Sequence, residues 1–151
     1  DGDQDLYVAN DFGRNCLYRN NGGKFVDVAG EADVEDSASG MAVTWGDYNR
    51  DGWMDVYISN MFSSAGNRIT FQEQFKPNAS PEVRTRLQRF ARGSTLLKNL
   101  DNGPFEDVSE EAGVARARWA WGTSFIDINN NGWEDLAVAN GNITGDDPDD
   151  L

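Results

Sequence analysis

Short runs of apolar and β-branched residues alternate along the chain with polar turns rich in Asp, Asn and Gly. The runs at 41–45 and 56–59 flank one of these turns. The runs at 17–19 and 25–28 flank another, Asn-Asn-Gly-Gly at 20–23, which is a hairpin-turn sequence. Runs of this length, separated in this way, predict short antiparallel strands and an all-β fold.

The pattern repeats. Residues 1–10, 51–60 and 131–140 share Asp or Asn, then Gly, two variable residues and Asp, followed by an apolar strand that ends in Asn. A second block at 17–28 matches 96–108. Four antiparallel strands in roughly 40–50 residues are typical of a propeller blade. The repeat therefore predicts a partial β-propeller of four-stranded antiparallel blades, about two and a quarter in number.

We expect one repeat domain over residues 1–151. Its parts are a partial blade at 1–30, a full blade at 40–108 and the start of the next blade at 119–140. So few blades cannot close a ring, since a closed propeller has about four or more. Because open sheet edges invite pairing, we expect further repeats or copies of the chain along the exposed strand edges.

An insertion at 61–93 interrupts the middle blade. Its segment 81–92 places Val83, Leu87 and Phe90 on one face at helical spacing. A serine before the segment suits an N-cap, and a glycine after it suits a helix end. The pattern predicts one amphipathic helix near 81–92.

This predicted helix is strongly basic in an acidic chain. Its arginines could dock an acidic neighbour or a polyanion, or they could form a solvated face that pairs with the chain's own carboxylates. We favour the second interpretation. The arginines are Arg84, Arg86, Arg89 and Arg92.

The turn at 47–55 carries oxygen-bearing side chains at every second position, which converge when the chain curls. Hard, partly anionic oxygen ligands suit Ca²⁺. The turn at 127–135 has the same spacing with one carboxylate fewer, so we expect weaker binding there; the segment 1–5 holds part of the pattern. The candidate ligands are Asp47, Asn49, Asp51, the Trp53 carbonyl and Asp55; Asp127, Asn129, Asn131, the Trp133 carbonyl and Asp135; and, for a partial third site, Asp1, the Asp3 carbonyl and Asp5.

Two other interpretations of these turns compete with calcium binding in a propeller. An EF-hand spaces its acids similarly but needs Glu at its last position, where this chain has Ile58 or Val138 inside apolar strands. Ordinary Asp, Asn and Gly turns would explain a single copy. Two full copies and one partial copy in equivalent strand contexts favour calcium loops.

Three features together identify a resemblance: the Asp-x-Asn-x-Asp-Gly-x-x-Asp loop at 47–55, the strands ending in Asn10, Asn60 and Asn140, and the stretch 105–114. The chain resembles the FG-GAP/VCBS repeats of integrin-α-like β-propellers. Within that family it is most similar to the repeats that precede the ASPIC/UnbV domain, the group that includes cartilage acidic protein. The resemblance implies calcium in the loops and an extracellular, secreted or cell-envelope location. It implies no particular ligand, because such folds serve many functions.

Composition narrows the function further. The chain has 26 acidic and 13 basic residues, a net charge of −13, so we expect no nucleic-acid partner. It has no His, and no residue outside the loops offers an activated nucleophile, so we expect no enzyme activity. No apolar run reaches the roughly 20 residues that a membrane span needs.

We therefore expect a calcium-binding extracellular propeller-repeat module that mediates adhesion through a protein or glycan ligand. One alternative is a structural subunit of a calcium-stabilised repeat assembly or filament. Another is a carbohydrate-recognising accessory domain of an enzyme, with exposed Trp stacking on sugar. Trp53 and Trp133 recur at one loop position, which favours packing instead. Asn78 and Asn142 lie in N-glycosylation sequons.

Overall fold

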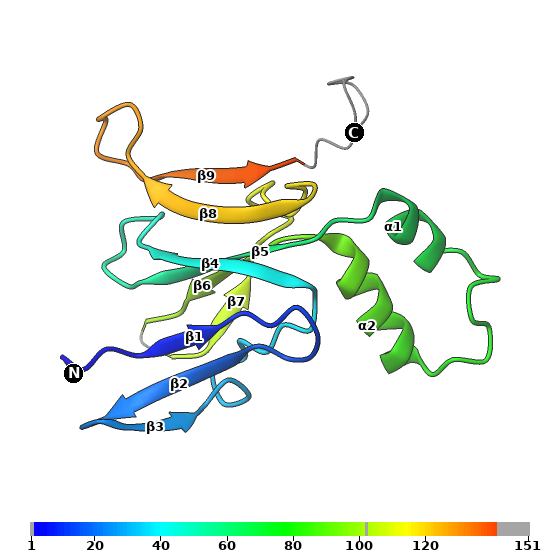
Figure 1. Ribbon diagram of the computed structural model, residues 1–151, viewed down its shortest axis with the longest axis horizontal. Helices are drawn as coiled ribbons and strands as arrows, with labels where there is room; N and C mark the ends of the chain where they lie inside the picture. Colours follow the sequence, from blue (N-terminus) through cyan, green and yellow to red (C-terminus); the bar gives the residue numbers. More distant parts are fainter. Residues whose placement is uncertain (1, 102, 142–151) are drawn as a thin grey trace.

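The computed structural model describes residues 2–101 and 103–141. This described part contains three antiparallel sheets and two short helices, so the predicted all-β class is confirmed (Figure 1). The sheets, in chain order the first, second and third blade, are compatible with a partial propeller. The elements are β1 (Leu6–Val8), β2 (Cys16–Asn21), β3 (Lys24–Asp27), β4 (Gly40–Gly46), β5 (Asp55–Asn60), α1 (Ser64–Thr70), α2 (Pro81–Arg92), β6 (Thr95–Asn99), β7 (Phe105–Asp107), β8 (Ala120–Ile126) and β9 (Asp135–Asn140).

The second blade shows the complete repeat. Its strands pair in the order β4-β5-β6-β7, and every residue of β5 is buried. In the first blade β1 pairs with β2 and β2 with β3, and in the third β8 pairs with β9. The β4–β5 and β8–β9 pairs share a register shift at the same place, after Gly40 and after Ala120. These blades therefore repeat in backbone detail as well as in sequence.

The predicted hairpin at 20–23 is confirmed. Asn21 pairs with Lys24, which leaves Gly22 and Gly23 as a two-residue turn between β2 and β3. Both glycines have positive φ, 61° and 90°. A two-residue turn of this kind needs positive φ at both positions, which glycine adopts at little steric cost.

The main hydrophobic core lies between the first and second blades. Tyr7 from β1 and Val56 from β5 are buried there, together with Leu17, Ile58 and Leu97. The Trp45 ring packs edge-on against Tyr7, with ring centroids 6.4 Å apart, and against Phe105 at 6.3 Å. These side chains come from strands of both blades, so the blades depend on each other for burial.

The third blade packs on the other face of the second. Phe125 from β8 lies edge-on to the buried Tyr57, with centroids 6.5 Å apart. The contact covers Gly46, where a Cβ atom would lie 2.4 Å from Phe125 Cδ2. A side chain at position 46 would displace the third blade, so the close approach requires glycine.

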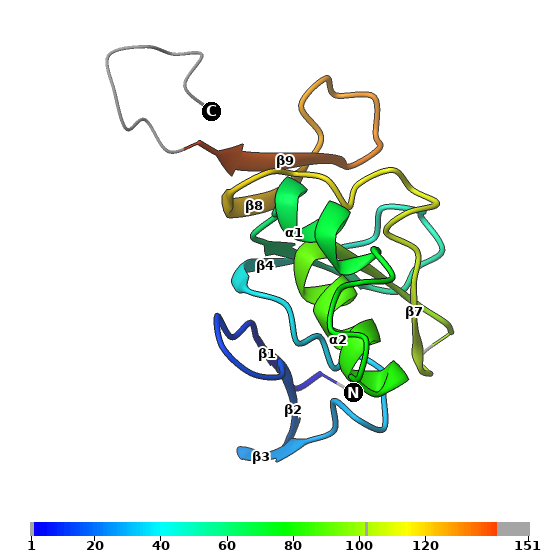
Figure 2. The same ribbon diagram turned by 90° about the vertical axis from the view of Figure 1, so that its right-hand side faces the viewer.

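The insertion contains α1 as well as α2, so the prediction of one helix was wrong in number. The predicted helix at 81–92 is confirmed as α2, with the Ser80 side chain accepting from Val83 N. The additional helix, α1, has seven residues and begins after Ser63, whose side chain accepts from Gly66 N. The two helices pack together and project from one side of the blade stack in Figure 1; in Figure 2 they lie in front of the blades.

Two arginines of α2 anchor the insertion to the blades. Arg89 Nε lies 3.2 Å from Asp36 Oδ1, and Asp36 is only 1 % exposed. Arg89 and Arg92 also pair with Asp107 of β7. Pairing with the chain's own carboxylates is therefore confirmed for these two arginines, whereas Arg84 donates to the Gln72 carbonyl. We call Asp36, Arg89, Arg92 and Asp107 the arginine-balanced cluster.

Candidate functional site: the aspartate loops

The two complete aspartate loops lie on the same side of the molecule, opposite α1 and α2 (Figure 1). The second-blade loop, residues 47–55, joins β4 to β5. The third-blade loop, residues 127–135, joins β8 to β9. The first-blade segment, residues 1–5, precedes β1, the counterpart of β5, and its Asp1 lies outside the described residues.

In the second-blade loop the acidic side chains turn inward and accept backbone N–H groups. Asp47 accepts from Asp51 N and Gly52 N, both at 3.0 Å. Asn49 Oδ1 also accepts from Asp51 N at 3.0 Å, and Asp51 Oδ1 accepts from Trp53 N at 2.9 Å. Side chains at alternating positions of the loop therefore accept backbone N–H groups of the same turn.

The third-blade loop repeats this pattern. Asp127 accepts from Asn131 N at 3.0 Å and from Gly132 N at 2.8 Å. Asn129 Oδ1 accepts from Asn131 N at 3.0 Å, and Asn131 Oδ1 accepts from Trp133 N at 2.8 Å. The sequence spacing thus produces the same local hydrogen-bond network in both blades.

The backbones of the two loops match as well. Arg50 and Asn130 occupy the same loop position, and both have left-handed φ, 60° and 59°. Asn tolerates this region better than Arg does. The shared conformation therefore follows from the loop's hydrogen bonds rather than from the residue at this position.

Asp55 is the last residue of the second-blade loop and the first of β5, and it lies in the interior of the protein. It is fully buried, and its Oδ1 accepts from Asn99 N at 2.8 Å. Its Oδ2 is also buried but has no hydrogen-bond partner within the described residues. A buried polar atom of this kind is costly unless something pairs with it.

The surroundings of Asp55 disfavour the ionised form of its carboxyl group. Burial raises the pKa of Asp55 to about 6. The Asn99 N–H lowers this pKa, the charges of Asp51 and Asp47 raise it again, and Lys98 compensates only weakly. A positive charge placed among the three carboxylates would reverse the shift.

The other two closing aspartates are less deeply placed. Asp135 is half-buried, and its Oδ2 accepts from Ile128 N at 3.1 Å within its own loop. Asp5 is exposed and accepts from Asn20 N at 2.8 Å, the same bond that Asp55 makes with Asn99. The side chain of Asp3 accepts from Gly22 N at 2.8 Å.

Sequence reasoning missed the asparagines that hold the closing aspartates. Asn20 is the last residue but one of β2, and Asn99 ends the equivalent strand β6. Each also donates its side-chain amide to a loop carbonyl, Gln4 O at 3.1 Å and Met54 O at 3.2 Å. The signal was present, because both asparagines belong to the second repeated block. The block alone does not say which loop it faces.

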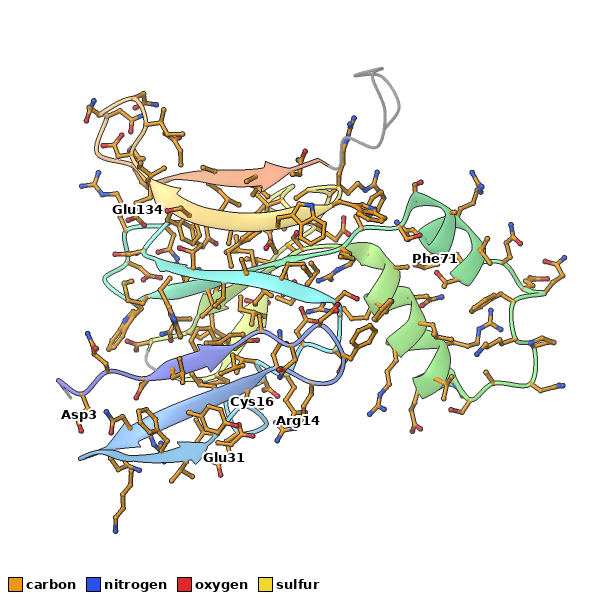
Figure 3. The ribbon with its side chains drawn as sticks, in the orientation of Figure 1. Asp3, Arg14, Cys16, Glu31, Phe71 and Glu134 are labelled. Carbon is orange, nitrogen blue, oxygen red and sulfur yellow. The ribbon has the colours of Figure 1, made fainter. Side chains whose placement is uncertain are left out.

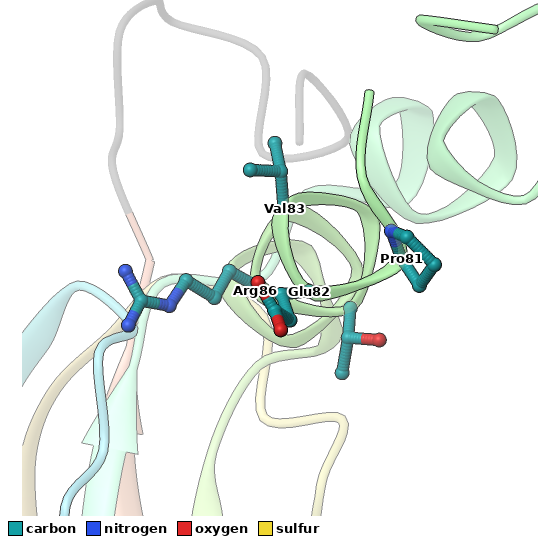
Figure 4. Close-up of a pocket in the computed structure, with 5 residues that line it drawn as sticks. Pro81, Glu82, Val83 and Arg86 are labelled. Carbon is teal, nitrogen blue, oxygen red and sulfur yellow. The ribbon is translucent and has the colours of Figure 1, made fainter. Parts of the chain in front are cut away.

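Within residues 2–101 and 103–141, no three His, Cys, Asp or Glu side chains form a ready-made metal group. The loops instead combine carboxylates with amide oxygens. The pocket at the start of α2 is no better candidate, because its side chains point away from one another (Figure 4). It is lined by Pro81, Glu82, Val83, Thr85 and Arg86.

Residues 1–58 match the family model of the FG-GAP-like repeat. The matched region holds the first blade, β4, the second-blade loop and most of β5. None of the curated proteins compared with the chain matches it. The match supports the FG-GAP family and a propeller-like module, which agrees with the repeated blades. In the part of the chain that the structure describes, no helix has the length and apolar character to cross a membrane.

Proposed function

We propose that this chain is a calcium-binding, non-enzymatic propeller-repeat module that acts outside the cell or in the cell envelope, where it binds a protein or glycan ligand. The observation that carries the calcium proposal is the buried Oδ2 of Asp55, which has no partner among the described residues. The charges of Asp51 and Asp47 oppose the ionisation of Asp55. A divalent cation would balance these charges.

The residues of the second-blade loop fit such an ion chemically. Asp47, Asp51 and Asp55 supply carboxylates, and Asn49 and the Trp53 carbonyl supply neutral oxygens. Ca²⁺ takes six to eight oxygen ligands of this kind, with water completing the shell. When bound, the ion would supply the positive charge that the loop lacks, and the native fold would gain stability by mass action.

The third-blade loop is proposed as a second, weaker site. It shares the hydrogen-bond pattern of the second-blade loop but has two loop carboxylates on the ligand positions, Asp127 and Asp135, in place of three. The first-blade segment is proposed as a partial third site.

The strand edges support the proposal of further repeats or copies as partners. β5 pairs with β4 on one edge and β6 on the other. Its counterpart β9 pairs with β8 alone within the described residues. An open edge of this kind offers backbone donors and acceptors to another strand.

Isothermal titration calorimetry of the full chain tests the calcium proposal. We expect calcium binding by the wild type and loss of the tighter site in Asp55→Asn, which keeps the acceptor for Asn99 N but removes the charge. Asp11→Asn, in an exposed position outside the loops, is the matched control and should bind as the wild type does. No binding by the wild type, or unchanged binding by Asp55→Asn, would refute the proposal.

Without calcium the same variant has a second signature. Asp55→Asn should be at least as stable as the wild type in chelator, because it removes a buried charge that has no adequate partner. A merely structural role for the Asp55 carboxylate predicts the opposite, namely a loss of stability in chelator. Thermal melts of both proteins with and without calcium separate the two cases.

A further inference from the structure

The second-blade and third-blade loops touch each other. The Arg50 guanidinium lies over the Trp133 ring, 5.0 Å from its centroid. A Cβ atom placed on Gly132 would lie 3.7 Å from Arg50 Nη1. Arg50 stands between the candidate ligands Asn49 and Asp51, so this contact joins the ligand-bearing stretches of both loops.

A second contact lies at the start of the second-blade loop. Glu134 reaches back toward Gly46, the residue directly before Asp47 (Figure 3). A Cβ atom on Gly46 would lie 2.5 Å from Glu134 Oε2. Phe125 N also donates to Thr44 Oγ1 at 3.4 Å. The third-blade loop therefore contacts the second-blade loop through Trp133 and the end of β4 through Glu134.

We propose that calcium binding in the second-blade loop raises the calcium affinity of the third-blade loop, and that Arg50 and Trp133 carry this coupling as positioning residues. The inference rests on the proposed calcium binding. Binding in one loop fixes the backbone around Arg50, which holds Trp133 in place. Part of the conformational entropy of the third-blade loop is then lost before its own ion binds, so that binding is more favourable.

The charge of the first bound Ca²⁺ disfavours binding of the second ion, so the effect of the Arg50–Trp133 contact must exceed this repulsion. Residues 47–55 hold three Asp and Arg50, a net charge of −2, so a bound Ca²⁺ brings the loop to zero and removes its net attraction for a second cation. This long-range effect is screened, because both loops are exposed and the Debye length is about 8 Å at physiological salt. The direct contact is not screened in the same way.

The expected coupling is modest. An exposed cation–π contact corresponds to a factor of about two to five in an equilibrium constant. Coupling is reciprocal, so calcium in the third-blade loop must raise the affinity of the second-blade loop by the same factor.

Calorimetric titration of the full chain with calcium alone measures the coupling. The wild type gives the overall constant for two ions, while Asp55→Asn and Asp127→Asn give each remaining site by itself. The overall constant divided by the product of the two single-site constants is the coupling factor. The same set is then measured with Arg50→Gln and with Trp133→Leu.

We expect a coupling factor of about two to five in the wild type. It should fall to one or below in Arg50→Gln and equally in Trp133→Leu, which removes the ring without changing the net charge. The double variant should show no further change, as expected for a single shared contact. Arg116→Gln, at an exposed arginine outside both loops, should keep the wild-type factor.

Three results would overturn the inference: a wild-type factor of one or below, an unchanged factor in both contact variants, or binding of one ion only, in the second-blade loop. Each of these leaves the calcium proposal for that loop intact. Absence of any calcium binding by the wild type would instead refute the proposed function itself, and the coupling with it.

Discussion

Two buried carboxylates on opposite sides of the molecule have pKa values shifted in opposite directions. Asp36, beside the insertion, is 1 % exposed, and Asp55, in the second-blade loop, is fully buried. Burial raises the pKa of Asp36, but the charge of Arg89 and the hydrogen bonds from Thr95 and Asn60 outweigh it, and the pKa falls below its usual range. The pKa of Asp55 rises to about 6.

The two carboxylates differ in the partners that the described residues give them. Asp36 Oδ2 accepts from Thr95 Oγ1 at 2.7 Å and from Asn60 Nδ2 at 3.0 Å, while Arg89 binds its other oxygen. Asp55 has one backbone donor, and two acids lie nearby. Within the described residues the charge of Asp55 is therefore poorly balanced, whereas Arg89 balances the charge of Asp36.

The largest effect is expected from removing the internal cation. Arg89→Ala should lower the free energy of unfolding by about 3–5 kcal/mol, because it leaves Asp36 buried without a charge partner. Urea denaturation measures this loss. Arg86→Ala, on the exposed side of the same helix, should change the free energy by no more than about 0.5 kcal/mol. Equal losses in the two variants would show that the cluster does not anchor the insertion.

Removing calcium should have the next largest effect. At a calcium concentration about 100 times Kd, the ion adds about 2.7 kcal/mol to the stability. For a domain of this size that corresponds to a fall in Tm of about 5–10 °C on chelation. Asp55→Asn should lose most of this response. Arg89→Ala should keep the response, because the arginine-balanced cluster lies on the other side of the molecule. Loss of the calcium response in Arg89→Ala would show that the two sides are not independent.

Packing at the aspartate-loop side is tested by Gly46→Ala. The added methyl would overlap Phe125 and Glu134, so we expect a loss of about 1–3 kcal/mol in urea denaturation. Gly122→Ala is the matched control, because its Cβ would meet only Ala139 Cβ at an ordinary 3.8 Å. A loss at Gly122 as large as that at Gly46 would contradict the close approach of the blades.

Acid should weaken the insertion side. Burial raises the pKa of Asp107, but the Ser109 hydroxyl and the Arg89 guanidinium outweigh it and hold the pKa well below its usual range. A carboxyl with a lowered folded pKa contributes stability above its unfolded pKa, near 4, and loses it as the pH falls toward the folded value.

The expected loss is about 1.4 kcal/mol per pH unit for each such group below pH 4. It should be measured in Asp55→Asn, where the opposite shift of Asp55 is absent, by urea denaturation at several pH values. Adding Asp107→Asn should flatten the dependence. An unchanged slope in that variant would show that Asp107 does not contribute to the pH dependence of stability.

Local features were predictable because neighbouring residues decide them. The Gly22–Gly23 turn, α2 with its Ser80 cap, and the inward curl of both aspartate loops depend on contacts within a few residues. α1 was missed because its seven residues include Gly66 and the β-branched Ile69 and Thr70, which have low helix propensity. The Ser63 cap and packing against α2 stabilise it instead.

The sequence by itself determined the repeat, the strands, and which residues of each aspartate loop are candidate oxygen ligands. Only the tertiary structure decided that Asp55 is buried against Asn99, 44 residues away, and that Arg89 meets Asp36 across 53 residues. The physical reason is that spacing sets local geometry, whereas burial and charge balance depend on which distant strands pack together. Two loops alike in sequence and backbone can therefore differ in how deeply their closing carboxylates, Asp55 and Asp135, are buried.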